Sequence, residues 1–124
     1  MANLIQVLDD GSEFQTHILQ MLEEYGDEEF CLSLIEVFIR DGALALGRLR
    51  NSVESRDAVK AHATAHSLKN MLGVLHSQKG IELAEQVCAQ LTTGFAEPPI
   101  HELFDFTTRL LDYCQTLVEA SRTV

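Results

Sequence analysis

Apolar residues recur every three or four positions along most of the chain, and this spacing constrains the fold more than any other feature. It is the spacing of one face of an α-helix, whereas a half-buried β-strand alternates every second residue. No segment alternates convincingly in that way, and glycine and proline gather between the periodic stretches. The pattern therefore predicts an all-α fold.

Residues that favour helix ends divide the pattern into five expected helices. The expected spans are 13–25, 28–53, 57–76, 77–93 and 99–121, preceded by a short apolar lead-in over 3–9. Their boundaries rest on capping and stop residues, namely Gly26, Asp27, Ser55 or Asp57, Ser77, Gly94 and Pro98-Pro99. We expect an antiparallel four-helix bundle with an additional N-terminal helix over 13–25, because short connections between amphipathic helices favour that packing.

The length of 124 residues is enough for one domain, 1–124, with its own core. Over 28–53, apolar residues recur at helical spacing, namely Phe30, Leu34, Val37, Phe38, Leu44 and Leu49. We expect the aromatic residues Phe30, Phe38, Phe104 and Phe106 in the core. The cysteines Cys31, Cys88 and Cys114 are far apart in sequence and lie among apolar residues, so we expect buried, reduced thiols. His17, His76 and His101 have no group of functional residues around them in the sequence.

The formal net charge is −10, from 9 Lys and Arg against 19 Asp and Glu. Such a chain is repelled by nucleic-acid phosphates and by anionic lipid, so we expect neither nucleic-acid nor membrane binding. No apolar run approaches the roughly 18–20 residues of a membrane helix, and the N-terminus lacks the pattern of a signal peptide. We therefore expect a cytoplasmic, monomeric protein whose partners are other proteins or small molecules.

The expected helix over 57–76 has an unusual distribution of side chains. At about 100° per residue, one face carries a continuous apolar stripe made of Ala61, Ala65, Leu68, Leu72 and Leu75. His66 lies roughly 160° from the centre of that stripe on the same wheel, so we expect its ring to face outward.

The residues predicted to surround His66 are small, basic or apolar. They are Val59, His62, Ala63, Lys69, Asn70, Gly73 and Val74. No carboxylate occurs from Ala58 to Ile81, although the chain as a whole is strongly acidic. We expect this face to be a docking surface for an acidic partner.

An outward-facing imidazole is suited to accept a phosphoryl group. A free imidazole has a pKa of about 6.5, so most of it is neutral and nucleophilic at cytoplasmic pH. Transfer of a phosphoryl group needs positioning and charge neutralisation more than covalent help, and Lys69 can place a positive charge near the phosphoryl oxygens. The chain offers no nucleotide-binding loop and no nucleophile–base pair, so we expect a phosphotransfer intermediate rather than a self-sufficient enzyme.

The segment Ala65-His66-Ser67-Leu68-Lys69 resembles the signature of histidine-containing phosphotransfer domains, commonly Ala-His-x-Leu-Lys-Gly. The similarity extends over most of residues 28–91. It implies that His66 is phosphorylated and that Lys69 steers the phosphate. It also implies that the partners are receiver domains of a hybrid sensor kinase and of a response regulator, in a two-component phosphorelay. The chain would have no cofactor of its own, and Mg²⁺ would be bound by the partner receiver.

Four positions depart from the family pattern. Asn70 and His76 stand where glycine is common, and Met71 and Leu72 stand where small residues are usual. Asn70 matters most, because it lies beside His66 on the predicted docking face, where it can narrow access or contact the phosphoryl group.

The sequence is also compatible with two other functions. The same bundle can serve as an interaction module that binds receiver or kinase domains without carrying phosphate. His62 and His66, four residues apart, can also bind a metal ion from one helix face. However, Ala63 occupies the glutamate position of the His-Glu-x-x-His motif and no third ligand is indicated, so we expect no metal site.

Overall fold

The computed structural model describes residues 13–95 and 97–122, which form five helices and no strand. The helices are α2 (Gln15–Tyr25), α3 (Glu28–Glu54), α4 (Ala58–Val74), α5 (Gln78–Leu91) and α6 (Glu97–Arg122). The predicted all-α class is confirmed, and the expected helices agree with these bounds to within a few residues. The lead-in expected over 3–9 lies outside the described residues.

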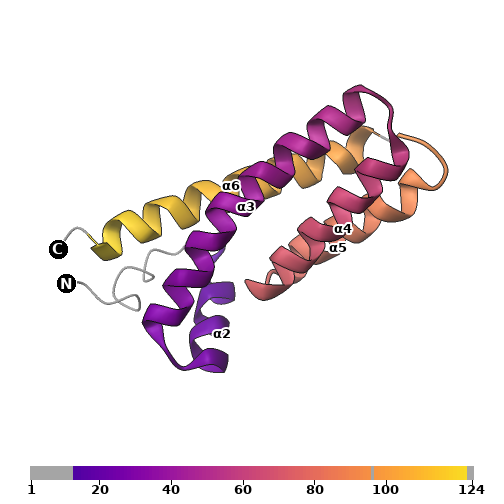
Figure 1. Cartoon of the computed structure of the whole chain (residues 1–124). Helices are drawn as coiled ribbons and strands as arrows, with labels where there is room; N and C mark the ends of the chain where they lie inside the picture. Colours follow the sequence, from indigo (N-terminus) through magenta and orange to yellow (C-terminus); the bar gives the residue numbers. More distant parts are fainter. Residues whose placement is uncertain (1–12, 96, 123–124) are drawn as a thin grey trace.

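Two helices flank α4, the helix that carries His66. Figure 1 shows α3 and α4 joined by a short turn, after which the chain returns through α5. α4 packs against α3 and α5, and α6 packs against the same two helices. An ion pair between Arg122 near the end of α6 and Glu36 joins α6 to α3. α2 packs against α3.

Side-chain caps fix where three of the helices begin. The carboxylates of Asp27 and Asp57 accept hydrogen bonds from the backbone N–H groups of Phe30 and Lys60, and the Ser77 hydroxyl accepts one from Gly80. These contacts satisfy amide groups that the helix leaves without a partner. Capping by Asp27 and Ser77 is confirmed, and Asp57 rather than Ser55 caps α4.

Both turns next to α4 contain a residue with left-handed backbone. The φ angle is 59° at Arg56, before α4, and 57° at His76, after it. The expectation that α4 continues to residue 76 is therefore wrong by two residues, because the helix ends at Val74 and His76 turns the chain into α5. Gly26 ends α2 in the same conformation, with φ 71°, as its position in the sequence predicts.

The core contains most of the apolar positions predicted for it, with a consistent exception on α3. Phe38 and Phe106 are buried and Phe104 is half-buried. In contrast, Phe30 is exposed, which contradicts its assignment to the core. Val37 and Leu44, which share its periodicity, are exposed too, Leu44 by 53%. The three are spaced seven residues apart, so they lie in a row along one edge of α3, where Phe30 still packs edge-on against Tyr25 of α2.

The predicted burial of the cysteines is correct for two of the three. Cys31 and Cys114 are buried, and burial raises the pKa of the Cys114 thiol to about 12. Cys88 is only half-buried, so its predicted burial was overstated, and all three thiols are free. No helix within the described ranges is long and apolar enough to cross a membrane.

Candidate functional site

The helical wheel predicted for the His66 helix matches the burial of α4. Its apolar stripe is buried along the whole length, with Ala61, Ala65, Leu68 and Leu72 at 0% exposure. His66 lies on the opposite side and is exposed. Because the stripe packs against the other helices, α4 cannot rotate about its axis without exposing core residues, and the outward position of His66 is fixed by this packing.

The predicted neighbours of His66 surround it on the outer surface of α4, and the small ones do not project as far as its ring. Five of them are exposed, namely Val59, His62, Ala63, Asn70 and Val74. Gly73 is half-buried because it lies near α5, where the methyl end of Ile81 would be 3.8 Å from an added Cβ. Small residues one turn before and two turns after His66 leave its ring accessible to a large partner.

Lys69, which is predicted to lie on the same outward face as His66, is half-buried and not exposed. It lies at the boundary between α4 and α5, where its charge acts on Cys88. Burial raises the pKa of the Cys88 thiol, and the positive charge of Lys69 opposes that rise. The Cys88 thiol lies 3.9 Å from the backbone carbonyl oxygen of His62, to which it donates. Lys69 thus lies beside the docking face, close enough to α5 for its charge to act on Cys88.

The charges of the chain are separated along its length. The segment from Gly42 to Ile81 contains six Lys and Arg residues and only two carboxylates, so its formal net charge is +4, whereas the whole chain has −10. The segment comprises the second half of α3, all of α4 and the start of α5. A locally positive surface in an acidic protein favours the approach of an anionic group to His66.

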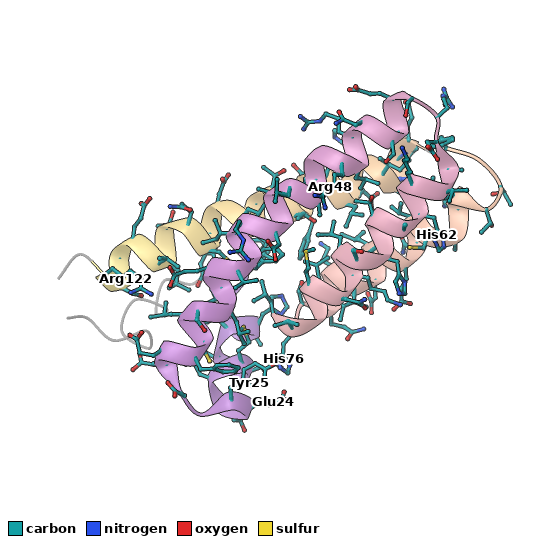
Figure 2. The ribbon with its side chains drawn as sticks, in the orientation of Figure 1. Glu24, Tyr25, Arg48, His62, His76 and Arg122 are labelled. Carbon is teal, nitrogen blue, oxygen red and sulfur yellow. The ribbon has the colours of Figure 1, made fainter. Side chains whose placement is uncertain are left out.

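A second group of polar residues, which the sequence did not reveal, lies where α2 meets the end of α4. Glu24, Tyr25 and His76 gather there (Figure 2), with His76 Nε2 2.7 Å from Glu24 Oε2. The Tyr25 hydroxyl lies 3.5 Å from the carbonyl oxygen of Val74, and its ring packs edge-on against the His76 ring at 5.9 Å.

His17 belongs to the same group, because its ring donates to the backbone carbonyl of His76. Burial lowers the pKa of His17, and the hydrogen bond to His76 partly opposes this effect. The sequence indicates no group around His17 and His76, and the structure gives both of them structural contacts between α2 and the end of α4. Residues about fifty positions apart form this group, so no local pattern could have indicated it. Its contacts attach α2 to the end of the His66 helix.

No three His, Cys, Asp or Glu side chains within 13–95 and 97–122 gather closely enough to hold a metal ion. His62 and His66 are both exposed on α4 with no such third ligand beside them in these ranges. Comparison of the chain with models of known protein families, with curated proteins and with solved structures finds no match. The properties of the site therefore rest on its own geometry and on the resemblance of its local sequence.

Proposed function

We propose that the chain is a histidine phosphotransfer domain that accepts a phosphoryl group on His66 from a receiver-domain aspartate and passes it to another receiver. The observation that carries this proposal is the exposed His66 on α4, opposite a fully buried stripe and among small and basic residues. The signature-like segment Ala65–Lys69 supports it independently. The relay would operate in the cytoplasm.

The transfer step requires little from this chain beyond presentation of the ring. A lone pair on a neutral imidazole nitrogen attacks the phosphorus of the aspartyl phosphate. The P–N bond forms while the P–O bond to aspartate breaks, and the aspartate leaves as a carboxylate. The same exchange in reverse delivers the group to the acceptor aspartate. Lys69, three residues from His66, supplies a positive charge toward the phosphoryl oxygens, and the partner receiver supplies Mg²⁺.

The packing of the helices supports the finer architecture that we propose, an antiparallel four-helix bundle of α3 to α6 with α2 as an additional helix. Turns of three residues join α3 to α4 and α4 to α5, which is too short for parallel neighbours. Each of the four helices contacts two of the others in a closed order. Such a bundle would hold α4 on two sides and leave its outer face free for a partner.

Replacement of His66 tests the proposal directly. Receiver domains phosphorylated with acetyl phosphate should transfer acid-labile phosphate to the wild-type chain and none to His66→Gln. The matched control is His62→Gln, which removes the neighbouring exposed imidazole on the same helix and should still be labelled. Undiminished labelling of His66→Gln would refute the site. Receiver binding without any labelling of the wild type would favour the interaction module.

The role of Lys69 has its own test. Lys69→Ala should slow transfer, whereas Lys69→Arg should restore part of the rate because it keeps the positive charge. Helical content measured by circular dichroism should be unchanged in both variants, because alanine and arginine both favour the helix at least as well as lysine does. Equal rates for the wild type and Lys69→Ala would exclude phosphate steering by this residue.

A further inference from the structure

A groove lies between α3 and α4, next to the face that carries His66. It encloses about 380 Å³ and is lined by Arg48, Asn51, Ser52, Ser55, Lys60, Ala63 and Thr64, which we call the α3–α4 groove. Figure 2 shows Arg48 on the part of α3 that lies beside α4. No carboxylate lines the groove, although the chain carries 19 acidic residues.

The hydroxyl groups of the groove are already engaged as donors. Ser52 donates to the carbonyl of Arg48 at 2.8 Å, and Thr64 donates to the carbonyl of Lys60 at 2.9 Å. The Ser55 hydroxyl likewise donates to a backbone carbonyl. The donors that remain for a ligand are therefore the guanidinium of Arg48, the ammonium of Lys60 and the amide of Asn51. All three belong to exposed residues, and two are cations.

Two carboxylates lie near these cations, and one of them, Asp57, pairs with Lys60 itself. Asp57 caps α4 through the backbone N–H of Lys60, and its second oxygen lies 4.0 Å from Lys60 Nζ. Asp41 is hydrogen bonded to Arg40 at 2.9 Å, and this bond, more than the charge of Arg48, lowers the pKa of Asp41. No hydrogen bond or ion pair within the described ranges engages the guanidinium of Arg48. The groove is thus lined by two cations and no carboxylate, and among the described residues Arg48 is the one of the two without an ion pair.

The position of the groove links it to His66. Ala63, which lines the groove, is one helical turn before His66 on α4. A stable protein interface covers about 800 Å² on each partner, so a domain that reaches His66 also covers the groove. On the other flank of α4, α5 presents the exposed Glu85. A partner seated on His66 therefore meets two cations toward α3, whereas toward α5 the negative charge of Glu85 lies near the positive charge of Lys69.

We propose that the α3–α4 groove binds acidic side chains at the rim of the receiver's phosphorylation site, and that Arg48 and Lys60 orient the receiver over His66. This inference rests on the proposed phosphotransfer function. It adds that the acidic side chains of the receiver lie on the α3 side of α4. Charge pairs at the edge of an interface act mainly on the association rate. The groove would thus set the rate of productive encounter and the choice among receivers.

Charge reversal on each wall of the groove tests this inference. The variants are Lys60→Glu on α4 and Arg48→Glu on α3, and the matched control is Lys79→Glu. Lys60 and Lys79 are both exposed and both lie in the first turn of a helix, so the helix dipole affects their replacements alike. The Lys79 ammonium lies 5.9 Å from the centre of the Phe106 ring, which directs it toward α6 and away from the groove.

The assay measures the second-order rate of transfer from receivers phosphorylated with acetyl phosphate, in low and in high salt. We expect a loss of about tenfold at low salt for each groove variant, a much smaller effect of Lys79→Glu, and a difference that shrinks as salt screens the charges. Labelling by phosphoramidate, a small phosphoryl donor that needs no docking, should be equal in all variants and would confirm that His66 is intact.

The outcomes separate this inference from the function on which it rests. Equal transfer rates for the wild type and both groove variants would overturn the groove and leave His66 as the carrier. Equal losses in the groove variants and in Lys79→Glu would also overturn it, because net charge alone would then explain the effect. A wild-type chain that takes phosphate from no receiver would refute the proposed function, and the groove proposal would fall with it.

Discussion

The same substitution, glycine to alanine, should have opposite effects at two helical positions. A Cβ added at Gly80, in the first turn of α5, would lie 2.8 Å from the Ser77 hydroxyl oxygen. It would also lie 3.0 Å from side-chain atoms of Leu72 and Phe106. A Cβ added at Gly47, in α3, would meet no atom within 4 Å apart from its chain neighbours and the nearby backbone of its own helix. Gly80 is therefore a point at which α5 approaches both α4 and α6 closely.

The expected free energies follow from these contacts. Alanine stabilises a helix by about 1 kcal/mol relative to glycine, so Gly47→Ala should raise the free energy of unfolding by about that amount. Gly80→Ala gains the same term but crowds the core, which costs about 1–3 kcal/mol. It also displaces the Ser77 cap, which costs about 1 kcal/mol. The net effect at Gly80 should be a loss of about 1–3 kcal/mol.

Thermal unfolding followed by circular dichroism measures both variants against the wild type. For a chain of this length, about 1 kcal/mol corresponds to a shift of roughly 4 °C in Tm. Gly47→Ala should melt a few degrees higher and Gly80→Ala several degrees lower. If Gly80→Ala melted at or above the wild-type temperature, α5 would not be packed as closely against α4 and α6 as described.

Three further predictions concern other parts of the chain. Asn70→Gly should lower stability by about 0.3–0.5 kcal/mol yet speed transfer to at least one receiver; a slower rate would mean that Asn70 makes a useful contact. Burial lowers the pKa of His17 below its usual 6.5, so the unfolded chain binds more protons and stability should fall as pH drops through 6.5. His17→Gln should show a smaller loss in urea titrations at pH 5 and 7.5, and an equal loss would contradict this origin. The buried Thr107 hydroxyl has no partner within the described ranges, so Thr107→Val should raise the urea midpoint by the equivalent of about 1 kcal/mol, and a lower midpoint would imply a hidden partner.

Local sequence signals were sufficient to predict where most helices begin and end. Asp27, Asp57 and Ser77 each cap a helix with a contact that spans only three residues, so the sequence contains the whole interaction. The exposure of His66 was equally predictable. The spacing of five apolar residues defines the buried face of α4, and the histidine is opposite that face.

Burial on α3 was harder to predict, because the width of a buried face depends on how many neighbours a helix has. Phe30, Val37 and Leu44 continue the apolar periodicity but are exposed along one edge of the helix. The group of His17, Glu24 and His76 was missed for a related reason, since it forms only when α2 packs near the end of α4. The α3–α4 groove likewise depends on the register between two helices.

The short turns before and after α4 have a consequence for how a phosphoryl group would travel. Each has three residues, and each pivots on a left-handed residue, Arg56 or His76, so α4 is anchored at both ends. Under the proposed function, α4 does not move to carry the phosphoryl group from one partner to the other. The donor and acceptor receivers must then bind the same surface around His66, one after the other. Because the second cannot bind until the first has left, dissociation of the first partner would limit the overall rate of the relay.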